Sequence, residues 1–112
     1  MYVYVLRLIK FLTKVPDTTV VREIKSQLTR SGTSIGANYF EALGASSKKD
    51  FQNYFRHALK SANETRFWLA LLRDGNLFNK DLIEEDALLL QETKELANIF
   101  GASLITMKGL RK

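Results

Sequence analysis

The stretch that decides the fold is residues 27–42, QLTRSGTSIGANYFEA, and it has a counterpart in residues 58–72, ALKSANETRFWLALL. In both stretches apolar residues recur at helical spacing, but small and polar residues stand where a simple helical core would carry Leu. An apolar face that admits Ser, Asn and Glu suggests packing against more than one neighbour. The two stretches therefore indicate a helical protein that assembles with other chains.

Working outward from these stretches, the pattern predicts four helices, over about residues 1–14, 19–43, 47–74 and 81–109. Residues 2–5, YVYV, also favour a strand by composition, but a lone strand would have no partner among helices. The predicted connections, about 3–6 residues long, favour antiparallel neighbours. We therefore predict an all-α, antiparallel up-down-up-down four-helix bundle in a single domain, residues 1–112.

The predicted helices have apolar faces at spacings of three and four residues. The face of the second helix is Val21, Ile24, Leu28, Ser31, Ile35, Asn38 and Ala42. The face of the third is Phe51, Phe55, Ala58, Ala62, Thr65, Leu69 and Leu72. The face of the fourth is Leu82, Leu89, Thr93, Leu96, Phe100, Leu104 and Met107. A second stripe on the third helix predicts a second neighbour, and it contains Tyr54, His57, Ser61, Glu64, Trp68 and Leu71.

Capping residues mark the predicted helix starts. Asp17 or Thr19 can cap the second helix, and Ser47 with Asp50 forms a capping box for the third. Asp81, with Glu84 three residues on, marks the start of the fourth.

Two glycines, Gly32 and Gly36, stand four residues apart inside the second predicted helix. A glycine inside a helix costs about 1 kcal/mol relative to alanine. This cost suggests a steric reason for the pair, most simply tight packing against another helix or another subunit.

Composition narrows the possible functions. With no cysteine and one histidine, His57, we expect neither a metal site nor a cofactor. The Glu-x-x-His pair of di-metal bundles is missing, because Tyr54 stands three residues before His57. No apolar run approaches the roughly 18 residues that span a bilayer. We expect a cytoplasmic protein without a membrane partner.

The net charge of +5 is concentrated in the first two thirds of the chain. An excess of this kind suits an anionic partner such as nucleic acid, although it is also compatible with an ordinary solvated surface. The candidate nucleic-acid-binding residues lie on the second and third predicted helices, and they are Arg22, Lys25, Arg30, Lys48, Lys49, Arg56, Lys60, Arg66 and Arg73.

A second group of candidates is polar and lies at or beside the apolar faces: Asn38, Glu41, His57 and Glu64. We predict a structural polar network that fixes helix register, because a buried polar group needs a partner. We predict no catalytic residue. A helix side offers His57 no preformed oxyanion donors, since its backbone amides are already bonded.

Residues 30–42, RSGTSIGANYFEA, followed by SKKDF at 47–51, resemble the four-helix-bundle proteins encoded in intervening sequences of bacterial 23S rRNA. Residues 58–69, ALKSANETRFWL, are similar to the same family. The resemblance implies a left-handed bundle that assembles as a ring-shaped homopentamer. Residues 66–69, RFWL, also resemble a related branch, the basic accessory variability proteins of diversity-generating retroelements, which bind nucleic acid and a reverse transcriptase.

These observations leave three hypotheses. The first is a non-enzymatic homo-oligomer that binds nucleic acid, most simply structured RNA, through a basic surface. The second is an accessory protein of a diversity-generating retroelement that binds a reverse transcriptase and its RNA template. The third, which the residues favour least, is an enzyme that uses His57 and Glu64.

Overall fold

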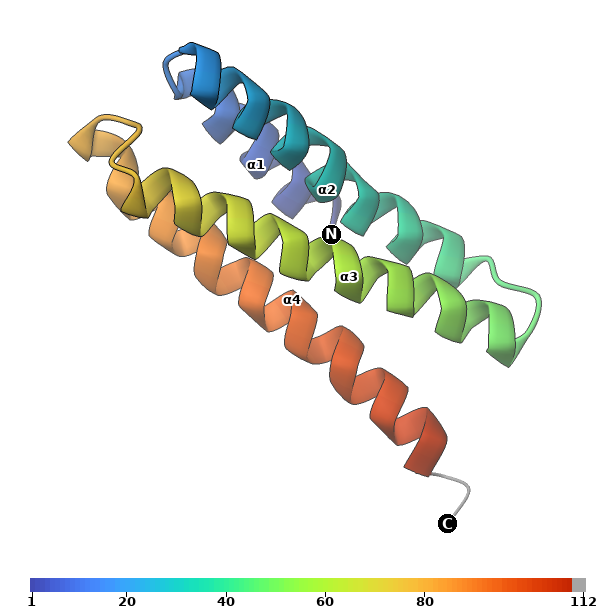
Figure 1. Ribbon diagram of the computed structural model, residues 1–112. Coiled ribbons are helices and arrows are strands. Elements are labelled where there is room, and N and C mark those ends of the chain that lie inside the picture. Colours follow the sequence, from blue (N-terminus) through green and yellow to red (C-terminus); the bar gives the residue numbers. More distant parts are fainter. Residues whose placement is uncertain (110–112) are drawn as a thin grey trace.

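The computed structural model describes residues 1–109, and within this range it has four α-helices and one 3-10 turn (Figure 1). The helices are α1 (Tyr2–Lys14), α2 (Thr19–Leu43), α3 (Lys48–Asp74) and α4 (Ile83–Gly109), and the turn η1 (Lys80–Leu82) directly precedes α4. Residues 1–109 are therefore all-helical, as predicted. The four helices form an elongated body of 49 × 22 × 21 Å.

Two of the predicted helix starts need correction. The side chain of Thr18, and not that of Asp17 or Thr19, accepts the amide of Val21 and caps α2. The predicted fourth helix begins two residues later than Asp81, because residues 80–82 form the tighter η1 turn. The hydrophobic period of the sequence does not reveal this turn.

One of the two hydrogen bonds predicted for the capping box of α3 is confirmed. The amide of Asp50 donates to Ser47 Oγ at 3.1 Å, as the capping box requires. The carboxylate of Asp50 instead accepts a hydrogen bond from the Ser46 hydroxyl at 3.3 Å.

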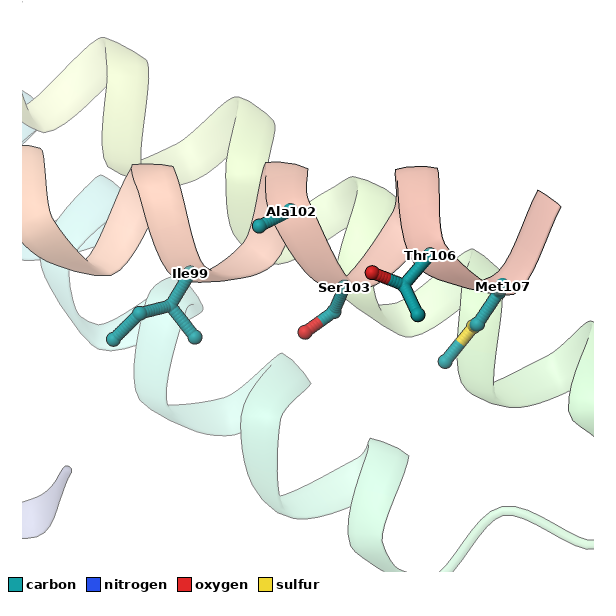
Figure 2. A pocket seen from close by; sticks show the side chains of 5 residues that line it. All are labelled: Ile99, Ala102, Ser103, Thr106 and Met107. Atoms are coloured by element: carbon teal, nitrogen blue, oxygen red, sulfur yellow. The ribbon is translucent and has the colours of Figure 1, made fainter. Parts of the chain in front are cut away.

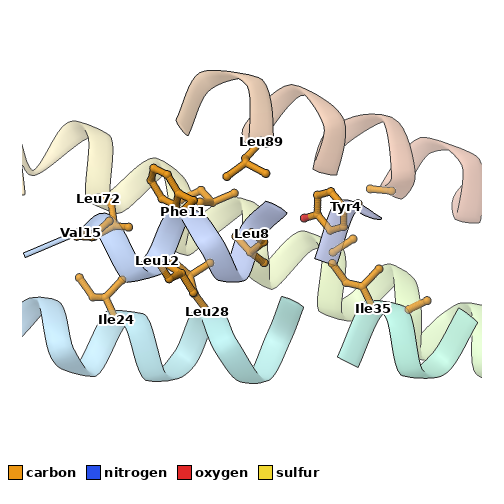
Figure 3. Packing of buried hydrophobic residues seen from close by; sticks show 14 of the residues in the cluster. Tyr4, Leu8, Phe11, Leu12, Val15, Ile24, Leu28, Ile35, Leu72 and Leu89 are labelled. Carbon is orange, nitrogen blue, oxygen red and sulfur yellow. The ribbon is translucent and has the colours of Figure 1, made fainter. Parts of the chain in front are cut away.

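The core is a continuous cluster of aliphatic and aromatic side chains along the inner faces of all four helices. Figure 3 shows Leu8, Phe11 and Leu12 of α1 inserted between α2 and α4. The predicted face of α2 is buried except at Asn38, which is half-buried, and that of α3 except at Phe51, also half-buried. On α4, Leu96 and Met107 are half-buried and the other predicted positions are buried.

Polar contacts fix how the helices are paired. Ser34 and Ser61 are joined at 2.8 Å, and Ser31 and Thr65 at 2.8 Å, so the sequence order on α2 runs opposite to that on α3. The contacts of α1 with α4 also run in opposite sequence order. Lys14 pairs with Glu85 and Arg7 with Glu92.

Candidate nucleic-acid interface

Helix α3 has a net charge of +3, with six Lys or Arg residues and three Asp or Glu residues. Three of the predicted binding residues, Lys49, Arg56 and Lys60, follow one outward line on this helix and are exposed. Arg56 donates to the neutral Asn53 side chain at 2.7 Å, which leaves its charge uncompensated. The structure thus brings these three cations together on one solvent-facing line.

A second group of cations meets in a groove between α3 and α4. Arg66 and Arg73 of α3 line a hollow of about 220 Å³, and Lys94 faces them from α4. Leu90 and Ala87 contribute apolar surface to the same hollow. The sequence prediction included both arginines but missed Lys94, because that lysine lies on a helix whose overall charge is negative. Only the register between α3 and α4 reveals that it joins them.

Arg73 is the one cation of this groove with an acidic partner in the described chain. Its guanidinium binds both carboxylate oxygens of Asp74, at 2.8 Å and 3.2 Å. The hydrogen bond to Arg73 lowers the pKa of Asp74, and that same bond raises the pKa of Arg73. The positive potential of the groove therefore comes mainly from Arg66 and Lys94.

Of the predicted binding residues on α2, two are exposed and one is held by hydrogen bonds within the protein. Arg22 and Arg30 are exposed. Lys25 is half-buried, and its ammonium donates to Val15 O and to Asp17 Oδ1, both at 2.8 Å. This hydrogen bond, with the charge of Lys25, lowers the pKa of Asp17. Lys25 therefore holds the connection between α1 and α2 in place, and its contact with nucleic acid stays a prediction.

The remaining predicted cation, Lys48, lies at the other end of the molecule. It is exposed, and its ammonium is 3.5 Å from Met107 O near the end of α4. On α1, Arg7 and Lys14 are paired with acidic residues of α4. These pairs neutralise part of the charge of both helices and leave α3 as the electropositive element.

The polar network of the structure differs from the predicted one. It contains Ser31, Ser34, Asn38, Ser61 and Thr65, with Asn38 donating to Ser34 O at 2.9 Å and to Ser34 Oγ at 3.0 Å. It sits between α2 and α3, where small polar side chains replace aliphatic ones. Asn38 thus belongs to a polar network, as predicted.

Three other residues assigned to this network lie outside it. Glu41, His57 and Glu64 are exposed, and their side chains form no hydrogen bond or ion pair within residues 1–109. The correction has a simple reason. They sit on the outer edge of the contact between α2 and α3, where solvent takes the place of a protein partner.

Sequence reasoning missed the one buried carboxyl of the described chain, Asp86. It is fully buried in α4, and neither oxygen has a hydrogen-bond partner. Burial raises its pKa to about 7, against an opposing effect from the charge of Arg73 and a reinforcing one from Asp74. Asp86 stands seven residues before Thr93, which was predicted to lie on the apolar face of the fourth helix. This heptad spacing indicates that Asp86 lies on the same face.

No group of three or more His, Cys, Asp or Glu side chains within residues 1–109 is placed to hold a metal ion. None of the helices in the same range combines the length and the apolar character that crossing a bilayer demands.

Fold and surface together define a small all-helical protein with a cationic third helix. The family model of the 23S rRNA-intervening sequence protein matches residues 2–100, and the chain belongs to this family. It is also similar to the crystal structure of a protein of unknown function from the S23 ribosomal protein family of Bacteroides thetaiotaomicron. The two are 34% identical with a TM-score of 0.71, and the match covers 91% of this chain and 89% of that one. No curated protein matches the chain.

Proposed function

We propose that the protein is a non-enzymatic, cytoplasmic homo-oligomer that binds structured RNA through the cationic surface of α3. The observation that carries this proposal is the outward line of Lys49, Arg56 and Lys60 on α3, the helix that also places Arg66 in the groove with Lys94. Side chains of this kind contact phosphates with little base selectivity. Arg22 and Arg30 are exposed on α2 and would add to the positive charge that an RNA meets.

The proposed assembly is a homopentamer of left-handed, up-down-up-down bundles. The opposite sequence order of the α2–α3 and α1–α4 contacts supports this topology. Exposed apolar side chains such as Phe67, 58% exposed, and Leu71 support burial against another subunit. Five copies of a chain with net charge +5 would carry +25. Such a charge attracts polyanions far more strongly than a single chain does.

Salt dependence tests the RNA-binding proposal. The purified protein is titrated against a fluorescent RNA hairpin in about 50 mM and about 200 mM salt, and native mass is measured in parallel. Contacts to about six phosphates should lower the association constant by roughly three orders of magnitude over this range, because bound counterions are released. Binding that is absent at low salt, or unchanged by salt, would contradict the proposal.

A second candidate function is that of a retroelement accessory protein that binds a reverse transcriptase. It is favoured by one observation, the edge-to-face pair of Phe67 and Trp68, whose ring centres are 4.9 Å apart and whose Phe67 ring is exposed. Exposed aromatic residues are frequent anchors of protein interfaces. In a binding assay with a purified retroelement reverse transcriptase, Phe67→Ala should then abolish association while RNA affinity stays unchanged. Association that survives this substitution would count against the second function.

A further inference from the structure

Asp86 takes no direct part in the proposed contacts with RNA, but it is the one buried carboxyl of the described chain. Neither of its side-chain oxygens has a hydrogen-bond partner there. A carboxylate in such a position loses the hydration of its charge and receives no hydrogen bond in exchange, so burial favours the neutral, protonated form. The pKa of Asp86 rises accordingly to about 7. The residue therefore changes its charge near neutral pH.

Asp86 lies next to the cationic groove between α3 and α4. The residue that follows it, Ala87, lines this groove, and so does Leu90, about one helical turn further on. Burial has the larger effect on the pKa of Asp86, and the bond to Asp74 has the larger effect on that of Arg73. Beyond these effects, the charge of Arg73 lowers the pKa of Asp86, and the charge of Asp86 raises the pKa of Arg73. A negative charge on Asp86 therefore acts on a cation of the groove.

The other charged residues around Asp86 come from α3, α1 and η1, the elements that pack against α4. They are all exposed: Arg73 and Asp74 of α3, Lys14 of α1, and Lys80 and Asp81 of η1. Lys14 pairs with Glu85 of α4, and Arg73 pairs with Asp74. None of them is bonded to the carboxyl of Asp86, so no partner within the described chain holds that carboxyl in its charged form.

A second hollow on α4 lacks this arrangement. It is larger than the groove, about 420 Å³ against about 220 Å³, and Figure 2 shows the side chains that line it. They are Ile99, Ala102, Ser103, Thr106 and Met107, and none of them carries a charge. Of these two hollows, the groove is therefore the one that attracts an anion.

We propose that Asp86 is a proton switch for the groove, which holds a phosphate group of RNA more tightly when Asp86 is protonated than when it is charged. Loss of the proton places a negative charge beside Arg73, and this charge opposes the attraction of the phosphate. For a phosphate about 10 Å from the carboxylate, effective dielectric constants of about 80 to 20 give roughly a 2- to 15-fold loss of affinity. The inference rests on the proposed RNA binding and adds its regulation by pH.

The first experiment measures the affinity of a fluorescent RNA hairpin at pH 5.5 and pH 8.5 by anisotropy, in about 50 mM salt. Wild type should bind roughly 2- to 15-fold more weakly at pH 8.5. Asp86→Asn should lose this pH dependence and bind more tightly than wild type at pH 8.5 by the same factor. The matched control is Glu41→Gln, which removes one negative charge from an exposed position on α2 and should keep the pH dependence of wild type.

Replacement of both Arg66 and Lys94 by Gln locates the effect. The double substitution removes the main cations of the groove, so the remaining affinity should depend on pH less than that of wild type. Any titration of the exposed His57 is common to all four proteins and cancels in the comparison. A pH dependence that is unchanged in the double variant would place the effect of Asp86 outside the groove and overturn the inference.

A second experiment does not depend on the folding of Asp86→Asn. Because coupling between two binding events is reciprocal, bound RNA must favour the protonated form of Asp86. Binding at pH 7 should therefore take up a fraction of a proton, which calorimetry in two buffers of different ionisation enthalpy measures. The exposed His57 is removed as a source of this proton by His57→Gln, which should show the same uptake as wild type.

The outcomes separate the switch from RNA binding itself. Equal pH dependence in wild type and Asp86→Asn, or no proton uptake in His57→Gln, would overturn the switch, while salt-dependent binding of the hairpin would still support the proposed function. No binding of the hairpin at pH 5.5 and low salt would contradict RNA binding, and the switch with it.

Discussion

Gly32 of α2 lies directly against Leu8 of α1: a Cβ atom at Gly32 would overlap Leu8 Cδ2. Leu8 is fully buried, so any displacement of its side chain must be accommodated inside the core. One turn further on, a Cβ atom at Gly36 would be 3.0 Å from Val5 Cγ2. The two glycines therefore set the distance between α1 and α2, and the tight packing that their spacing indicated is confirmed as a contact between helices of one chain.

Gly32→Ala should destabilise the protein by about 1–3 kcal/mol, the usual cost of overpacking a filled core. The added methyl group must displace Leu8 or move α1 away from α2. Urea denaturation followed by circular dichroism measures the effect. An unchanged midpoint would show that α1 is not held at this distance.

Gly101→Ala is the opposite case and serves as the control. Gly101 lies within α4, and a Cβ atom there would have no neighbour within 4 Å. The substitution should stabilise the protein by about 0.5–1 kcal/mol, because alanine loses less conformational entropy than glycine in a helix. If the urea midpoint falls instead, the space beside Gly101 is occupied in solution.

Tyr4→Phe tests the buried hydrogen bond that joins α1 to α4. The Tyr4 hydroxyl is bonded to Thr93 Oγ1 in the core, and Thr93 also donates to Leu89 O at 2.6 Å. Burial raises the pKa of Tyr4 to about 12. Loss of this hydroxyl should cost about 0.5–1.5 kcal/mol in the free energy of unfolding. Tyr2→Phe, at a position 68% exposed, should have almost no effect, and equal losses in the two variants would argue against the bond.

Periodicity predicted the four helices because each apolar face repeats within one segment, and no knowledge of the neighbours is needed. It also placed Ser31 and Thr65 on these faces, and the structure shows both buried and bonded to each other. The register between two helices cannot be predicted from periodicity in one segment, because it depends on both segments. The groove position of Lys94 follows only from that register, and the role of Lys25 follows from the path of the connection before α2, so single-helix patterns did not reveal them.

The raised pKa of Asp86 predicts that the stability of the protein depends on pH. Its pKa is about 7 in the folded chain, whereas an exposed Asp titrates near 3.9, so between these pH values the folded state binds the extra proton. The contribution of Asp86 is therefore most favourable below about pH 4 and declines until about pH 7. The whole decline is at most about 4 kcal/mol.

Asp86→Asn removes this titration. Urea denaturation at pH 4.5, 6 and 8 should show the variant gaining stability relative to wild type as the pH rises. Glu84→Gln, an exposed acid on the same helix, provides the control for the loss of one negative charge. A constant difference between Asp86→Asn and wild type at all three values would mean that Asp86 does not titrate in this range.

The double substitution of Lys49 and Lys60 by Gln separates specific phosphate contacts from net charge. Both lysines lie on the outward line of α3, and each phosphate contact contributes about 0.7–0.9 to the slope of log K against log salt. For an RNA hairpin the slope should therefore become shallower by about 1.4–1.8. The paired control replaces Lys10 and Lys108 by Gln, which removes the same charge from α1 and α4 and should leave the slope nearly unchanged. Equal changes in the two double variants would show that RNA responds to overall charge and would remove α3 as the interface.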